Sequence, residues 1–168
     1  DDAARDALHR IQAPSGLLYW GGHLAWDLDQ EKPVGQGTDS TEMKGHHPDY
    51  RLMYRVAPKD TVHLMDGVWA GHRLDWSRLD YNRHASVRHT GRPKWDHDYD
   101  TDIEVPFPAV GGNLSFCNVT PSLIHAGVML ATLDDSSDAL LWTERLVERW
   151  QQGRDIKTGL CGGQLSYR

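Results

Sequence analysis

Three short segments of the sequence carry side chains that together could perform metal-assisted chemistry. His23 follows two glycines, Glu42 lies in a polar segment, and Arg83 stands directly before His84. Two imidazoles and a carboxylate form a donor set that suits a borderline divalent metal. A guanidinium beside such a ligand would place a cation, or unusually a base, next to whatever the metal holds. The set therefore indicates chemistry on an acidic substrate.

Each of these residues also has a structural interpretation. A single histidine is more often a hydrogen-bonded structural residue than a metal ligand, and Glu42 could be a solvated loop carboxylate. His46 and His47 flank the same region and are alternative ligands. The spacings match no compact metal motif such as HExxH. The metal hypothesis therefore depends on whether these distant segments meet in the fold.

A second polar segment mixes cations, an aromatic ring and carboxylates. Arg92, Lys94 and Trp95 could hold an acidic sugar through charge and stacking. Alternating aspartates follow directly, as in some calcium loops: Asp96, Asp98, Asp100 and Asp102. The segment lacks the Gly at position 6 and the Glu at position 12 of an EF-hand, so that motif is absent.

The elements that must position these residues are predicted to be mainly helical. Apolar spacing and prolines in first turns predict helices over residues 2–12, 48–56, 58–73, 121–133 and 137–152. Residues 17–28 are interpreted as an extended strand or loop, and residues 30–41 as a loop. Residues 76–120 lack periodicity and are predicted to be a long functional loop with short strands. Successive helical hairpins favour an α/α solenoid or toroid.

The last predicted helix has the clearest pattern. Ser136 or Ser137 is expected as its N-cap, because serine is favoured at that position. Its inner face is predicted to hold Leu140, Leu141, Leu146, Val147 and Trp150.

Composition limits the classes of function. The 168 residues fit one domain. The net charge of −6 argues against a nucleic-acid-binding surface as the main function. No apolar run approaches the length of a membrane span, and the start of the chain has no signal-peptide pattern. Cys117 and Cys161 form no disulfide framework, and we expect two buried thiols. Seven Trp and six Tyr against two Phe favour rings with polar tips, which sugar-binding clefts use for stacking.

Several phrases of the sequence resemble bacterial pectate lyases, most closely the family-two polysaccharide lyases, which are α/α toroids. The phrases are Tyr19-Trp20-Gly21-Gly22-His23, Thr41-Glu42-Met43-Lys44-Gly45-His46-His47-Pro48, Leu74-Asp75-Trp76 and Tyr81-Asn82-Arg83-His84. A further phrase, Lys157-Thr158-Gly159-Leu160 ahead of Gln164-Leu165-Ser166, is similar to one found in other toroid uronate lyases.

The resemblance implies a role for each candidate residue. His23, Glu42 and His84 would hold the metal, and Arg83 would be the Brønsted base. A family lysine that helps bind substrate would correspond to Lys94, with Arg92 as the alternative. Trp95, Trp20 and Lys44 are the other residues expected to bind substrate. The implied reaction is β-elimination on polygalacturonate, which gives 4,5-unsaturated galacturonides. The implied cofactor is a divalent metal, Mn²⁺ or a similar transition metal rather than Ca²⁺.

The resemblance also implies a setting for the chain. The expected partner is an acidic polysaccharide, with no nucleic acid and no membrane, and a periplasmic or secreted location is favoured over the cytoplasm. Family members are several times longer than this chain. Residues 1–168 are therefore expected to form a single catalytic domain that is part of a larger toroid, or whose cleft is completed by a second chain or copy.

Two other classes of function fit parts of the sequence. A glycoside hydrolase on an α/α scaffold would need two carboxylates at a defined separation. Asp96, Asp98, Asp100 and Glu104 offer candidates. A non-catalytic carbohydrate-binding module is favoured by the short length.

Overall fold

The computed structural model describes residues 2–20, 24–35, 40–42, 47–88, 95–102, 115 and 117–165, with the backbone alone for residues 40–42. Its helices are α1 (Asp2–Ile11), α2 (Tyr50–Val56), α3 (Pro58–His72), α4 (Thr120–Leu133) and α5 (Ser137–Gln152). Its strands are β1 (Ala25–Asp27), β2 (Lys32–Val34), β3 (Ser40–Glu42), β4 (Arg73–Asp75), β5 (Asp80–Tyr81) and β6 (His84–Ser86). The predicted fold, mainly helical with short strands, is confirmed.

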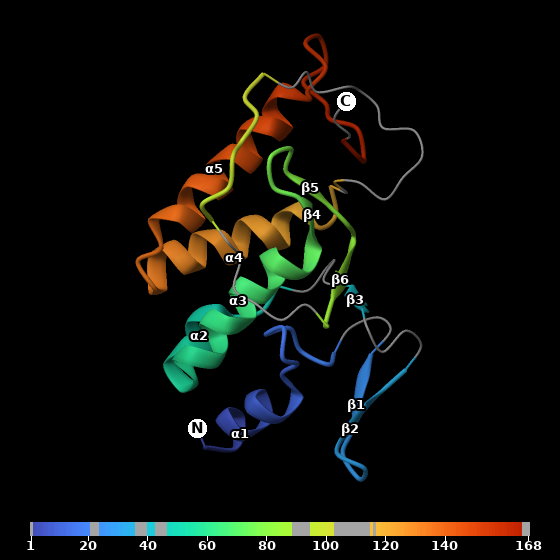
Figure 1. The fold of residues 1–168 in the computed structure, drawn as a ribbon, viewed down its shortest axis with the longest axis vertical. Helices are drawn as coiled ribbons and strands as arrows, with labels where there is room; N and C mark the ends of the chain where they lie inside the picture. Colours follow the sequence, from blue (N-terminus) through green and yellow to red (C-terminus); the bar gives the residue numbers. More distant parts are fainter. Residues whose placement is uncertain are drawn as a thin grey trace.

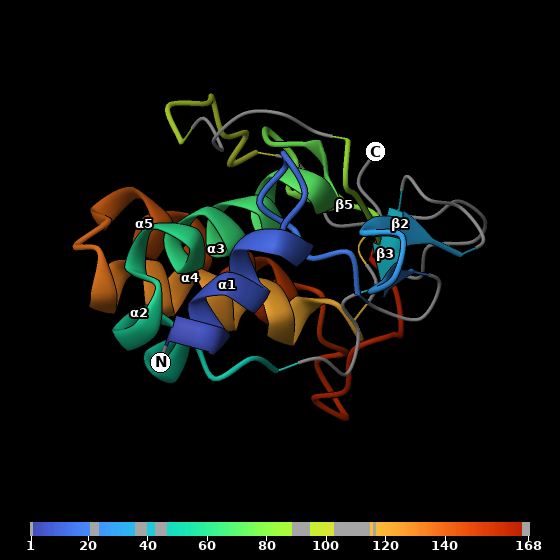
Figure 2. The same cartoon turned by 90° about the horizontal axis from the view of Figure 1, so that it is seen from below.

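The helices form a row along one side of the molecule, and the short strands lie along the other side (Figure 1). In this row α5 packs on α4, α4 on α3, and the short α2 on both α3 and α4, while α1 contacts α2. The view from below shows the same separation, with α1 to α5 grouped away from β2 and β3 (Figure 2). Such a row of helices is consistent with part of an α/α toroid.

Local sequence signals explain where the helices begin. Asp49 caps α2 by accepting a hydrogen bond from the Leu52 N–H at 3.0 Å, and Ser136 caps α5 by accepting one from the Ala139 N–H at 3.3 Å. Pro58 starts α3, where its missing N–H leaves no helical bond unmade. The predicted N-cap and the predicted bounds of the last helix, 137–152, are therefore confirmed.

The core is centred between α3, α4 and α5 and extends to the strand side through residues such as Tyr81 and Ala85. It contains fully buried side chains from each helix, among them Met65, Val68, Leu123, Leu130, Trp142 and Leu146. Gly127 lets α4 and α5 approach closely, because a Cβ there would lie 1.9 Å from the Thr143 Oγ1. The helical layer is therefore a tightly packed unit.

The predicted inner face of α5 is partly wrong. Leu140 and Leu141 are 41% and 44% exposed, whereas the buried face comprises Ala139, Trp142, Thr143, Leu146 and Arg149. Arg149 is buried because its guanidinium lies over the Tyr99 ring, 4.9 Å from the centroid, and donates to the Asp100 carbonyl. A long cation is thus part of the buried face of α5, whereas two of the leucines that apolarity assigned to that face are exposed.

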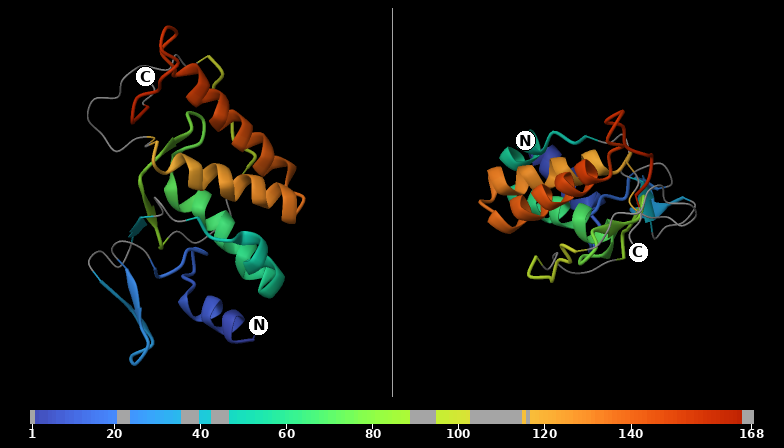
Figure 3. Two further views of the ribbon diagram at one scale, coloured as in Figure 1. Left: turned by 180° about the vertical axis from the view of Figure 1, so that it is seen from behind. Right: turned by 90° about the horizontal axis from the view of Figure 1, so that it is seen from above.

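The strands of the described residues form three separate two-stranded antiparallel sheets, β1–β2, β3–β6 and β4–β5. The view from behind shows them following one another along the strand side of the molecule (Figure 3). Strand β2 and the first two residues of strand β3 fall within residues 30–41, for which a loop was predicted. In β3–β6 the partners are distant in sequence, and α2 and α3 lie between them in the chain.

Two further expectations concern the cysteines and membrane-spanning helices. Cys117 and Cys161 are free and exposed, so the expectation of buried thiols is wrong. Within the described part of the chain, no helix combines the length and apolarity needed to cross a membrane.

Candidate active site

The sheet formed by β3 and β6 joins two of the predicted metal-binding segments. Its register pairs Ser40 with Ser86, Thr41 with Ala85, and Glu42 with His84. Residues paired in this way in an antiparallel sheet occupy the same face, with Cβ atoms typically about 5 Å apart. The register therefore places Glu42 directly opposite His84 along the two strands, although the two residues are far apart in sequence.

The faces of β6 differ in burial. Ala85 is fully buried, whereas its neighbours His84 and Ser86 are only half-buried. Because side chains alternate along a strand, Ala85 faces the helical layer and His84 lies on the opposite face. Gly71 of α3 allows this close packing, since a Cβ there would lie 3.2 Å from both the Ala85 Cβ and the Ser86 carbonyl oxygen.

The turn that leads into β6 is fixed by Asn82. Its N–H donates to the carbonyl of His72 at 2.8 Å, and its own carbonyl accepts from the His72 Nδ1 at 2.8 Å. Its side-chain Oδ1 accepts from the His84 N–H at 3.2 Å. Burial lowers the pKa of His72 to about 4, so the imidazole is neutral near neutral pH. Arg83 is half-buried and lies between the two residues that these bonds restrain.

The strand before this turn is anchored to the helices by Tyr81. Its hydroxyl is hydrogen-bonded to the Thr120 hydroxyl at the start of α4 and accepts from the Trp150 Nε1 of α5 at 2.9 Å. Its carbonyl accepts from the Ser115 N–H at 2.6 Å. Burial raises the pKa of Tyr81 above its ordinary value, so the phenol stays protonated and keeps both bonds.

A buried carboxylate next to this anchor was not predicted from sequence. Asp80 is 8% exposed and pairs with Asp75 across β4–β5. Burial, together with the Asp75 charge, raises the pKa of Asp80 to about 6. The two-residue strand β5 carries no periodicity that would have indicated this burial.

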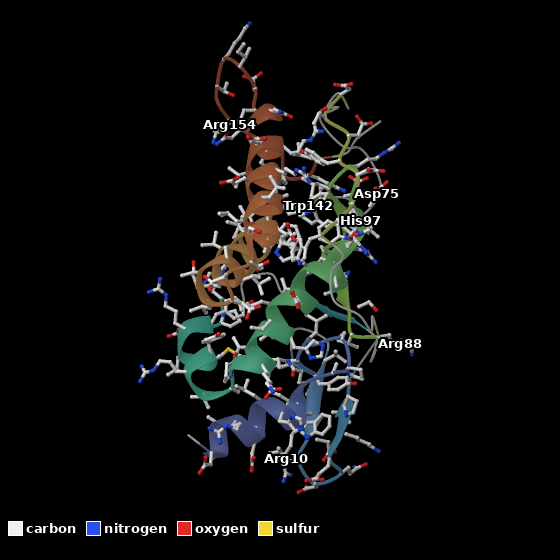
Figure 4. The ribbon with its side chains drawn as sticks, turned by 60° about the vertical axis from the view of Figure 1, so that its left-hand side comes forward. Arg10, Asp75, Arg88, His97, Trp142 and Arg154 are labelled. Carbon is white, nitrogen blue, oxygen red and sulfur yellow. The ribbon has the colours of Figure 1, made fainter. Side chains whose placement is uncertain are left out.

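An aromatic cluster fills the space between β4, α3 and α5. Trp76 stacks on Trp69 with ring centroids 5.7 Å apart and meets Trp142 edge-on at 4.8 Å. His97 stacks on Trp76 at 5.3 Å. Figure 4 shows Trp142, His97 and Asp75 close together, with Arg88 well apart from them. An open cavity of about 420 Å³ lies beside this cluster, lined by Arg73, Leu74, Asp75, Trp76, Ser77, His97 and Asp98.

The predicted substrate-binding residues are divided between described and undescribed parts of the chain. Trp20 is 60% exposed. Trp95 is half-buried, with its ring edge-on to Trp69 and Trp76 at 5.3 Å in both cases. Lys44, Arg92 and Lys94, as well as His23 and the alternative ligand His46, lie outside the described residues. Their roles stay predictions.

The chemistry of the available donors fits a divalent transition metal. Carboxylate and imidazole ligands suit Mn²⁺ and its neighbours, whereas Ca²⁺ takes oxygen ligands almost exclusively. The described side chains contain no group of three His, Cys, Asp or Glu residues that could hold an ion. The side chains of His23 and Glu42 are not among them, so the three-ligand site stays a prediction.

The fold and the β3–β6 pairing define a mainly helical domain that carries candidate metal ligands and an arginine on its strand side. Residues 1–168, the whole of the chain, match the family described as periplasmic pectate lyase, and the chain belongs to this family. It is also similar to the pectate disaccharide-lyase of Dickeya dadantii (strain 3937), with 32% identity over 162 residues. That alignment covers 93% of this chain and 30% of the relative. The family's description as periplasmic agrees with the location favoured by the sequence.

Proposed function

We propose that the protein is a lyase that cleaves polygalacturonate by metal-assisted β-elimination. The observation that carries this proposal is the pairing of Glu42 with His84 on adjacent strands. His84 directly follows Arg83 in the chain. Membership of the pectate lyase family supports it. So does the name of the Dickeya relative, although this chain spans only 30% of that protein's length.

In the proposed reaction, Arg83 removes the proton at C5 of a galacturonate. The electron pair of the C5–H bond forms the C4–C5 double bond, the C4–O bond breaks, and the leaving oxygen takes a proton from water. C5–H is a weak acid because the adjacent carboxylate already carries a negative charge, so the reaction needs a strong base. A guanidinium is ordinarily protonated, and we therefore expect activity to rise toward alkaline pH.

His23, Glu42 and His84 would hold the metal. When bound, it supplies Lewis-acid stabilisation of the negative charge that develops on the substrate carboxylate. Arg92, Lys94, Trp95, Trp20 and Lys44 are the proposed substrate-binding residues. Their cationic groups would pair with uronate carboxylates, and their indole rings would contact sugar faces.

A product assay separates this function from its rivals. Incubation with polygalacturonate and Mn²⁺ is expected to produce ultraviolet absorbance from the new double bond, which is conjugated with the carboxylate. New reducing ends without that absorbance would indicate a hydrolase. If neither product forms, the result would indicate a binding module or an incomplete part of the catalytic domain.

Two variants assign the roles of neighbouring residues. Arg83→Lys is expected to lower kcat by about 10²–10⁴, the range for loss of a general base, while Mn²⁺ binding measured by calorimetry survives. His84→Ala is expected to lose the metal in elemental analysis. Arg78→Lys, on the turn between β4 and β5, is the matched control and should retain both properties. Full activity in Arg83→Lys would contradict the assignment of the base.

A further inference from the structure

We infer that His72 is a positioning residue for the proposed elimination, because it holds the turn from which Arg83 and His84 project. The inference rests on the proposed function. His72 is the last residue of α3 and is fully buried. It does not belong to the candidate ligand set, and it acts through the backbone of Asn82 rather than on substrate.

Two hydrogen bonds close a ring between His72 and Asn82. The Asn82 N–H donates to the His72 carbonyl at 2.8 Å, and the Asn82 carbonyl accepts from the His72 Nδ1 at 2.8 Å. The last carbonyls of a helix have no partner within the helix, so Asn82 also satisfies the C-terminal end of α3. The ring fixes both backbone polar groups of Asn82 relative to a packed helix.

The hydrogen bond to Asn82 also defines the tautomer of the His72 imidazole. A carbonyl can only accept, so Nδ1 must carry the hydrogen. The Nε2 atom is buried and has no hydrogen-bond partner among the residues that the structure describes. An unsatisfied buried acceptor destabilises a fold, and an apolar side chain of similar size would avoid that penalty. What the imidazole contributes at this position is the Nδ1–H donor to Asn82.

The restraint continues from Asn82 into the candidate site. The Asn82 Oδ1 accepts from the His84 N–H at 3.2 Å, which sets the direction in which the chain enters β6. Arg83 therefore has a restrained residue on each side. Tyr81 holds the preceding strand independently through α4 and α5. His72 is thus the described link that joins α3 directly to Asn82, next to the proposed base.

Three substitutions separate positioning from space filling. The amide nitrogen of His72→Asn can take the place of Nδ1 and donate to the Asn82 carbonyl. His72→Gln reaches instead toward the position of Nε2, and His72→Leu has no donor. We expect the His72→Leu and His72→Gln variants to lower kcat on polygalacturonate by about 10–100-fold, the range found for residues that orient metal ligands. KM should change little, and Asn should recover most of the lost activity.

Amide hydrogen exchange gives a readout that does not depend on activity. The His84 N–H should exchange faster in the Leu and Gln variants than in the wild type, and Asn should restore its protection, while α5 amides stay unchanged. Equal loss in all three variants, or full kcat with unchanged His84 exchange in His72→Leu, would overturn the inference. If Leu does not fold, Gln against Asn makes the same comparison. Absence of elimination by the wild type would instead contradict the proposed function, while the exchange rates still test the restraint.

Discussion

The helical layer and the strand side of this molecule are stabilised in different ways. Residues of α3, α4 and α5 interdigitate over long buried faces, so their position is determined by many small contacts. The pairs β3–β6 and β4–β5 are two or three residues long and depend on a few specific groups, notably Gly71, His72 and Tyr81. Extended packing therefore governs stability in the helical layer, while a few single contacts and hydrogen bonds govern geometry on the strand side.

The largest expected effect lies in the helical layer. Trp142 is fully buried, contacts Trp76 and donates from Nε1 to the Trp95 carbonyl at 2.6 Å. Trp142→Ala should lower the free energy of unfolding by about 3–5 kcal/mol through the lost contacts and the cavity. Urea denaturation measures this change. Leu140→Ala, at an exposed position of the same helix, is the control and should stay within about 0.5 kcal/mol of the wild type.

A smaller effect is expected where α4 meets α5. The Cβ of Gly127→Ala would lie 1.9 Å from the Thr143 Oγ1, and that hydroxyl already donates to the Ala139 carbonyl at 2.7 Å. The two helices must separate or Thr143 must change rotamer, which should destabilise the protein by about 1–3 kcal/mol. Gly163→Ala meets no atom within 4 Å and serves as the control. A Gly127→Ala protein as stable as this control would contradict tight packing of the layer.

A Gly→Ala substitution where α3 faces the strand β6 should separate activity from stability. In Gly71→Ala the new Cβ would lie 3.2 Å from the Ala85 Cβ and 2.8 Å from the Leu17 Cδ1. The gain in helix propensity, about 1 kcal/mol, offsets much of that crowding, so stability should change little. However, β6 must move by a few tenths of an ångström, and we expect elimination activity to fall while the thermal midpoint is retained. Equal loss of both would show that the two regions respond alike.

The smallest expected effect is a change in pH dependence. The pKa of Asp80 is raised from 3.8 to about 6, so its contribution to stability is present below pH 4 and is lost as the pH rises through 6. The pKa of His72 is lowered from 6.5 to about 4. Its contribution to stability is therefore present above pH 6.5 and is lost as the pH falls through 4. The two partly cancel in the wild type.

Asp80→Asn keeps an acceptor for the Ser115 hydroxyl and removes one of these titrations. The free energy of unfolding of the variant should therefore rise more steeply between pH 4 and 6 than that of the wild type. Urea titrations at several pH values measure the slope. Parallel curves for the two proteins would show that Asp80 titrates normally in the native state.

The sequence predicts the helical layer well because each helix has its own local signals. Pro58, Pro121 and Ser136 indicate helix starts, and the bounds of α5 follow directly. The assignment of Leu140 and Leu141 to the inner face was wrong because burial of Arg149 depends on Tyr99 and Asp100, which lie in another segment. The apolar pattern within one helix does not indicate a partner from another segment.

The candidate site could be predicted only as a set of residues. The sequence singles out Glu42 and His84, but their pairing depends on three-residue strands that have no measurable periodicity. His72 and Asp80 were missed for the same reason, since their environments are created by segments that are distant in the chain. The resemblance to a known family supplied the metal-ligand and base roles of His23, Glu42, Arg83 and His84. The structure adds the hydrogen bonds that restrain the backbone beside Arg83 and at His84.

The long separation between β3 and β6 also has a consequence for the order of folding. Joining these strands closes a loop of about forty residues, which costs entropy that no local contact offsets. Helices α4 and α5, by contrast, are neighbours in the chain and can pair rapidly. We therefore expect the Glu42–His84 pair to form late in folding, after α3 has docked, and to open first under mild denaturant. The chemistry of this protein would then fail before its helical layer unfolds.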